Sequence, residues 1–116
     1  MSRSEDWVRL RHMLDAARMA VDFVSARDGG GSGYYPIELL GLEKLVENIG
    51  EAASRLSPTT MDRMPEVAWK QMIGMRHVLV HDYFDVDDLV VLDTVRVYLP
   101  SLAHELERVL EEDGRA

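Results

Sequence analysis

Apolar side chains recur at alternating three- and four-residue intervals along most of the chain, the spacing of one helix face. The first such run comprises Trp7, Leu10, Leu14, Ala17, Val21 and Val24. Ser4 precedes the run and is followed by Glu5 and Asp6, a pattern typical of an N-cap with acids in the first turn. The spacing therefore predicts a first helix whose apolar face spans residues 7–24 and whose N-cap is Ser4.

A glycine-rich segment follows. Residues 28–33 hold four of the eight glycines in the chain, and we expect a flexible loop over 28–35. Pro36 suits the first turn of a second helix. The apolar stripe of that helix comprises Leu39, Leu42, Val46, Ile49, Ala53 and Leu56. Residues 57–60 are expected to end the second helix and to open a short helical turn around 60–63.

The remaining pattern predicts further helices and no strands. A third helix is expected from Pro65 to about Val80, and Asp85–Asp88 has the acidic character of an N-cap and first turn of a fourth helix. Pro100 should kink or restart that helix, because proline lacks a backbone donor. No segment alternates with period two. We therefore predict an all-α antiparallel bundle of four to five helices, forming one domain over residues 1–116.

Gly50 and Gly74 fall inside predicted helices, where glycine costs about 1 kcal/mol relative to alanine. We expect two helices to approach each other closely at both positions. The two glycines are interpreted as packing residues rather than as parts of a site.

The composition is that of a globular protein, with 47% hydrophobic and 29% charged residues among 116. The chain contains no cysteine, which excludes disulfides, thiolate metal sites and cysteine nucleophiles. No apolar run approaches the roughly 20 residues that span a bilayer, and residues 1–6 lack the apolar core of a signal peptide. We therefore expect a cytoplasmic protein without membrane contact.

The net charge of −8 at first argues against nucleic-acid binding. However, residues 1–81 carry ten basic and eleven acidic side chains, whereas residues 82–113 carry ten acidic and two basic ones. The acidity is therefore regional, and the segment 55–81 is mildly basic. The charge predicts weak non-specific RNA affinity and an acidic flank able to meet a basic partner.

The residues that could take part in catalysis or ligand binding cluster in the segment 75–84. Arg76 and Tyr83 lie within about 20° of the same helix face, whereas Arg76 and His81 are about 140° apart. All three can converge only if the helix ends near His81 or if a second chain completes the site. A cation, a side chain that titrates near neutrality and a phenol in one cleft would suit phosphate chemistry.

A metal site is the alternative interpretation of the same segment. His77 and His81 have the i, i+4 spacing of two metal ligands on one helix face. Val78 takes the place of the glutamate that a metalloprotease motif requires, and Asp82 or Asp85 would have to supply further ligands. Two histidines alone fall short of a tetrahedral site, so we expect neither a metal nor another cofactor.

The spacing Arg76, four residues, His81, one residue, Tyr83 resembles the motif of HepT-type toxins, a branch of the HEPN superfamily of small helical ribonucleases. The likeness covers most of residues 39–110. It is carried by the segments 48–53, 55–57, 65–69, 73–76, 80–84, 92–95 and 99–100. His77 fits the polar residue that HEPN proteins tend to carry after the arginine. The glycine-rich segment 28–33 is the least typical part.

The resemblance implies a HEPN-type bundle and a metal-independent endoribonuclease that works as a homodimer. Arg76 and His81 would be its catalytic residues, with His77 and Asp82 in supporting positions. It further implies that the chain is the toxin of a type VII toxin–antitoxin system. Its partner would be a minimal nucleotidyltransferase antitoxin that transfers AMP from ATP to Tyr83.

Two other functions are compatible with the same residues. The chain could be a non-catalytic helical subunit that docks on a nucleotidyltransferase and presents substrate or nucleotide to it, with Arg76 as a phosphate anchor. It could also be a helical oligomerisation module, since one fold hosts many functions.

Overall fold

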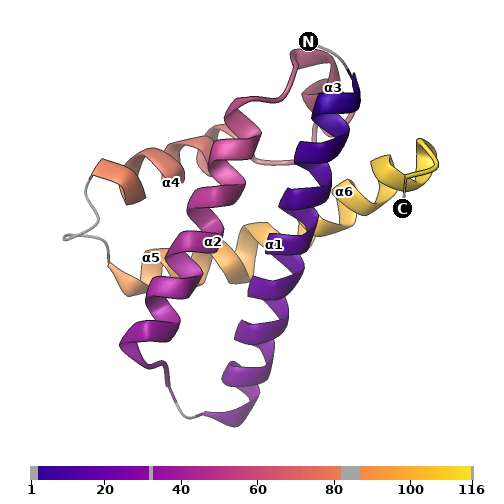
Figure 1. Ribbon diagram of the computed structural model, residues 1–116. Helices are drawn as coiled ribbons and strands as arrows, with labels where there is room; N and C mark the ends of the chain where they lie inside the picture. Colours follow the sequence, from indigo (N-terminus) through magenta and orange to yellow (C-terminus); the bar gives the residue numbers. More distant parts are fainter. Residues whose placement is uncertain (1–2, 32, 82–86, 116) are drawn as a thin grey trace.

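The computed structural model describes residues 3–31, 33–81 and 87–115, and every regular element in these ranges is helical (Figure 1). The elements are α1 (Arg3–Gly30), α2 (Pro36–Ser54), α3 (Pro58–Asp62), α4 (Trp69–His81), α5 (Asp88–Asp93), the π-helical turn η1 (Thr94–Tyr98) and α6 (Leu99–Glu112). The helices α1 and α2 form an antiparallel hairpin, α4 packs against α2, and α6 crosses α1 (Figure 1). The predicted all-α architecture is confirmed.

The described helices share one apolar core. Its largest fully buried side chains are Met13, Leu14, Ile49, Met64, Met72, Leu99, Leu102, Leu106, Leu110, Val46, Val91 and Val95. The predicted stripes of α1 and α2 are buried or half-buried in this core. None of the helices in the described ranges combines the length and the apolar character of a membrane-crossing segment.

The first helix is longer than predicted at both ends. It begins at Arg3, so Ser4 lies inside the helix and its prediction as the N-cap is wrong. It continues to Gly30, which makes residues 28–30 helical rather than part of a loop. Gly31 ends the helix with a φ of +69°, and its N–H donates to the carbonyl of Arg27 at 3.2 Å. A left-handed residue at this position is a common helix C-cap and is easiest for glycine.

Side-chain bonds tie the two ends of the predicted loop together. The Tyr34 hydroxyl donates to Asp28 at 2.6 Å, and Arg96 of η1 donates to both oxygens of Asp28 at 2.8 Å. Arg27 pairs with Glu38 in the first turn of α2. These bonds anchor the described residues on either side of position 32. The glycine content of the segment did not indicate this anchoring.

A buried polar cluster connects the start of α1 to α3. The carboxylate of Asp6 is 2% exposed and accepts hydrogen bonds from the hydroxyls of Ser57 and Thr60, each at 2.6 Å. Ser57 is also the N-cap of α3, because its hydroxyl accepts from the backbone N–H of Thr60. The short helix predicted around 60–63 is therefore present, two residues earlier than expected.

The helix α4 begins at Trp69, four residues later than the predicted start at Pro65. Residues 65–68 form turns instead, because Met64 and Val67 are buried and draw this segment onto the core. The indole N–H of Trp69 donates to the carbonyl of Met64 at 3.1 Å and fixes the start of the helix.

The C-terminal elements follow the predicted signals. Asp87 caps α5 by accepting from the backbone N–H of Leu89 at 2.8 Å, while Asp85 lies outside the described residues. The helical path changes just before Pro100, where the π-helical turn Thr94–Tyr98 precedes α6. Proline provides no N–H for the carbonyl four residues earlier, so a widened turn at this point is expected.

Candidate active site on helices α2 and α4

Arg76 lies in the middle of α4 on the side that faces α2. Met72 and Leu79, one turn before and one turn after it, are 1% and 3% exposed and hold α4 in the core. The Arg76 side chain itself keeps 34% of its surface exposed. The apolar residues of α4 thus place a half-buried cation at the edge of the α2–α4 contact.

Gly50 makes this contact possible. A Cβ built on Gly50 would come within 2.4 Å of the Cβ of Arg76 and within 2.8 Å of the carbonyl oxygen of Met72. The close approach predicted for Gly50 is therefore confirmed, and its partner is the arginine of the motif. The same prediction for Gly74 is wrong, because a Cβ there would meet nothing within 4 Å in the described part of the chain.

Glu51, the next residue on α2, pairs with Arg76. Its Oε2 lies 2.6 Å from a terminal nitrogen of Arg76, and its Oε1 accepts from the Nε of Arg55 at 2.9 Å. The hydrogen bond from Arg55 and the charge of Arg76 lower the pKa of Glu51, against the opposing effect of partial burial. Glu51 therefore stays a carboxylate at neutral pH, shared between two guanidinium groups.

Sequence reasoning did not single out Glu51. The i, i+4 spacing of Glu51 and Arg55 indicates an ordinary helix ion pair, which is how most such pairs are interpreted. The contact with Arg76 spans 25 positions of sequence and depends on how α2 crosses α4. The segment 48–53, which carries part of the family resemblance, contains Glu51 but does not identify Arg76 as its partner.

The guanidinium of Arg76 is only partly used by the described residues. Its Nε is buried and has no hydrogen-bond partner among them, and its one ion-pair partner in those ranges is Glu51. A guanidinium carries five N–H donors. The buried Nε cannot reach a phosphate, so the terminal N–H groups of this partly exposed side chain are the donors available for binding one.

The other predicted site residues lie at or beyond the end of α4. His77 is exposed, next to Arg76. His81 is the last residue of the helix, so its Cα lies about 7.5 Å along the axis and about 140° around it from that of Arg76. The side chain of His81 and the whole of Asp82 and Tyr83 lie outside the described residues.

A small groove is lined on one side by residues near the C-terminal end of the described part of α4. Its volume is about 260 Å³, and it lies between α2 and α4. The lining residues are Leu40, Glu43, Lys44, Glu47, Leu79 and Val80. Burial and the nearby charge of Asp88 raise the pKa of Glu43. The end of α4 therefore lies beside a surface with both apolar and acidic character.

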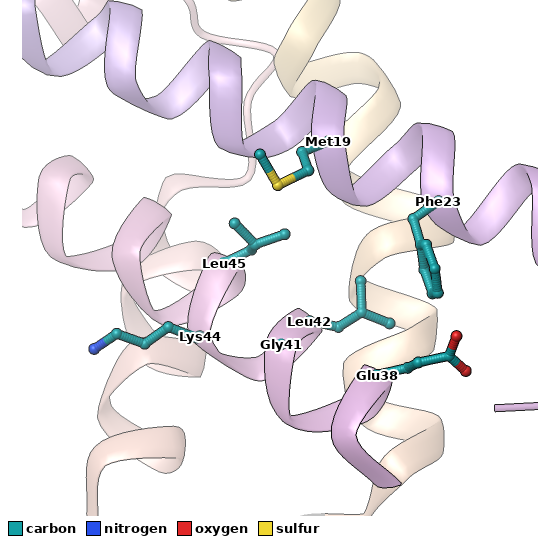
Figure 2. A pocket seen from close by; sticks show the side chains of 7 residues that line it. All are labelled: Met19, Phe23, Glu38, Gly41, Leu42, Lys44 and Leu45. Atoms are coloured by element: carbon teal, nitrogen blue, oxygen red, sulfur yellow. The ribbon is translucent and has the colours of Figure 1, made fainter. Parts of the chain in front are cut away.

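A second groove, of about 380 Å³, lies on the other side of α2, between α2 and α1 (Figure 2). Phe23 and Met19 of α1 face Leu42 and Leu45 of α2 across it, and Lys44 points away from it (Figure 2). Its charged rim residue Glu38 is already paired with Arg27. This groove offers mainly apolar contact surface, and its two charged lining residues, Glu38 and Lys44, are paired with Arg27 and Glu47.

Many of the C-terminal acids pair with arginines. Glu107 lies 2.7 Å from Arg18 of α1, and Asp113 lies 3.0 Å from Arg63. Arg108 pairs within α6, with Glu105 and Glu112 at 2.9 Å each. Arg63 belongs to the mildly basic segment 55–81, and the ion pair with Asp113 neutralises its charge at the C-terminal end of the chain. The regional charge difference is therefore smaller in the folded chain than along the sequence.

The described residues contain no group of three or more histidine, aspartate or glutamate side chains placed to hold a metal ion. The alternative metal site would need the His81 side chain together with Asp82 or Asp85. Those groups lie outside the described residues.

Comparison with known proteins gives one family. Residues 13–109 match the family model described as "Ribonuclease HepT-like". No solved structure matches the chain significantly.

Curated relatives carry ribonuclease names. The chain is 27% identical over 109 residues to "Putative RNase MJ1380" of Methanocaldococcus jannaschii, covering 94% of this chain and 100% of that protein. It is 32% identical over 69 residues to "Putative RNase MJ0125" of the same organism, covering 60% of each chain. It is 39% identical over 67 residues to "Probable ribonuclease HepT" of Thermococcus cleftensis, covering 57% of this chain and 60% of that protein. In the last two cases the match thus spans about three fifths of the relative.

Proposed function

Because this chain belongs to the HepT-like ribonuclease family, we propose that it is a metal-independent endoribonuclease, the toxin of a type VII toxin–antitoxin system that acts in the cytoplasm. The observation that carries this proposal is the placement of Arg76. It is a half-buried cation in α4 that packs against Gly50 and pairs with Glu51, and its Nε has no hydrogen-bond partner among the described residues.

The proposed reaction uses the two motif residues on one RNA linkage. His81 removes the proton from a ribose 2′-hydroxyl, whose oxygen attacks the adjacent phosphorus, or it protonates the leaving 5′-oxygen. Arg76 stabilises the additional negative charge of the pentacoordinate transition state. The products are a cyclic phosphate and a 5′-hydroxyl end. His77 and Asp82, on either side of the pair in sequence, are proposed to support RNA binding and the orientation of His81.

A homodimer is proposed from the exposed face of α2 and α4. Ile37 and Leu40 of α2 are 78% and 60% exposed, and Val80 of α4 is 39% exposed. Leu40 and Val80 line the α2–α4 groove, and Val80 follows Arg76 by one helical turn. A second copy packed on this face by two-fold symmetry would bring two motifs into one cleft. Arg76 of one copy would then work with His81 of the other, which removes the problem of their 140° separation on one helix.

Cleavage of RNA by purified variants tests the catalytic assignment. We expect Arg76→Ala and His81→Ala each to lower the cleavage rate by roughly 100-fold or more. Arg18→Ala is the matched control, since it also removes an arginine paired with a glutamate, on the α1–α6 side of the bundle. Equal rates for all four proteins would show that a contaminating nuclease causes the cleavage and would overturn the proposal.

We further propose that a nucleotidyltransferase antitoxin neutralises the chain by attaching AMP to Tyr83. A phosphodiester-linked AMP adds negative charge and bulk two residues from His81, so it would repel the RNA phosphate. Incubation with a minimal nucleotidyltransferase of this antitoxin type and with ATP should add the mass of one AMP. Tyr83→Phe should stay unmodified, and modification of that variant would exclude Tyr83 as the acceptor.

A further inference from the structure

We propose that Glu51 is a positioning residue of the same site: it holds the guanidinium of Arg76 in the orientation that the transition state needs. The inference rests on the proposed ribonuclease function and adds to it a residue outside the motif. Glu51 comes from α2, whereas the proposed catalytic pair lies on α4.

The contact geometry shows how the orientation is fixed. The carboxylate of Glu51 meets a terminal nitrogen of Arg76 at 2.6 Å, in the range of charge-assisted hydrogen bonds. Gly50 lets the base of the Arg76 side chain lie against the α2 backbone. The arginine is therefore restrained at its Cβ by packing and at its tip by an ion pair. A long, flexible side chain restrained at both ends loses little entropy when it binds a phosphate.

Arg55 restrains the carboxylate in turn. From the C-cap of α2, one turn beyond Glu51, it donates through Nε to the second oxygen of Glu51 at 2.9 Å. Each carboxylate oxygen thus has an arginine partner. The three residues together carry one net positive charge, so the group remains attractive to a phosphate.

The same contacts argue against Glu51 as a general base. One of its oxygens accepts a hydrogen bond from Arg55 and the other is ion-paired with Arg76, and its pKa is lowered, chiefly by the hydrogen bond from Arg55. A carboxylate with a lowered pKa is a weaker proton acceptor. Orientation of Arg76 is the role that remains.

Steady-state cleavage by Glu51→Gln separates positioning from simple RNA binding. The substitution removes one negative charge beside the RNA, so KM should stay the same or fall. Loss of the fixed orientation should nevertheless lower kcat by roughly tenfold or more. Glu51→Asp keeps the charge on a shorter side chain and should give an intermediate kcat.

Glu107→Gln is the matched control for these measurements. Glu107 pairs with Arg18 at 2.7 Å with similar exposure, and the substitution changes the net charge equally, far from the site. It should leave kcat and KM as in the wild type. A Glu51→Gln enzyme with unchanged or raised kcat would overturn the inference, and so would one in which only KM rises.

NMR of the arginine side chains supplies a readout that does not depend on cleavage. Rotation of the Arg76 guanidinium should be slow in the wild type and in Glu107→Gln, and fast in folded Glu51→Gln. Fast rotation in the wild type would overturn the positioning role. Failure of the ribonuclease proposal has a different signature, namely wild-type cleavage that survives Arg76→Ala.

Discussion

Gly50 of α2 lies directly against Arg76 of α4, so closely that a single added methyl group would sit 2.4 Å from the Cβ of the arginine. The distance is shorter than any van der Waals contact between carbon atoms. The position of the proposed catalytic arginine is therefore coupled to the absence of a side chain 26 positions earlier in the sequence.

This coupling predicts opposite outcomes for two glycine substitutions. Gly50→Ala should lower the free energy of unfolding by about 1–3 kcal/mol, because the backbone of Met72 blocks the space and the helices must separate. The methyl group of Gly74→Ala would meet nothing within 4 Å. This substitution should raise the free energy of unfolding by up to about 1 kcal/mol, because alanine has a higher helix propensity than glycine. Urea denaturation of both variants measures the difference. Destabilisation of similar size in both would contradict the assigned contact.

The same contact predicts an effect on activity. Folded Gly50→Ala should cleave RNA at least about tenfold more slowly than the wild type, since Arg76 is displaced from the position it now occupies. Gly74→Ala, which touches nothing, should retain wild-type rates. A fully active Gly50→Ala enzyme would show that the precise position of Arg76 does not matter.

The proposed homodimer predicts a difference between two exposed apolar residues. Leu40→Asp places a charge on the α2–α4 face and should raise the dimer dissociation constant at least about tenfold. Val97→Asp on η1 is the control, because Val97 is 63% exposed and Leu40 is 60% exposed. Sedimentation equilibrium distinguishes the two. Dimerisation that is equally strong in both variants would exclude this face as the interface.

The Asp6 cluster predicts a large loss of stability on truncation. Asp6→Ala leaves the hydroxyls of Ser57 and Thr60 without their acceptor in a buried environment, which should cost about 2–4 kcal/mol of unfolding free energy. Asp62→Ala on the exposed side of α3 removes the same charge and should change stability by less than about 0.5 kcal/mol. Urea denaturation at pH 7 gives both values.

The contribution of Asp6 should also depend on pH. Burial raises the pKa of its carboxyl, but hydrogen bonds from Ser57 and Thr60 and the charge of Arg9 outweigh burial and lower it below 3.8. A lowered pKa in the folded state means that the stabilisation is present above about pH 4 and is lost as the pH falls through the folded-state pKa. The stability difference between wild type and Asp6→Ala should therefore shrink below pH 4. A constant difference down to pH 2 would contradict this.

Asp28 provides a direct test of the anchoring at the end of α1. Hydrogen bonds from Arg96 and Tyr34 lower the pKa of its carboxyl to about 2. Arg96→Ala removes the larger cause and should move that pKa back toward 3.8, as measured by carbon-13 NMR of the carboxyl. Arg108→Ala, which removes an arginine from α6, should leave it unchanged. An ordinary pKa for Asp28 in the wild type would mean that the Arg96 pair does not persist in solution.

The sequence predicted helix boundaries well where a single residue determines the boundary. Pro36 starts α2, the Asp85–Asp88 signal is met by Asp87 as the cap of α5, and the helix is interrupted before Pro100. The predicted start of α4 at Pro65 was wrong, because burial of Met64 and Val67 outweighed the preference of proline for the first turn of a helix.

The sequence by itself determined the helical class, the apolar stripes and the spacing of Arg76, His81 and Tyr83, because these follow from the period of one helix and from single residues. Only the tertiary structure decided that Gly50 touches the motif and Gly74 does not, and that Glu51 is the partner of Arg76. It also decided which acids near the C-terminus are neutralised by Arg18 and Arg63. Each of these contacts joins side chains from different helices. They depend on the angle and register at which the helices cross, and the packing of the whole core sets those two quantities.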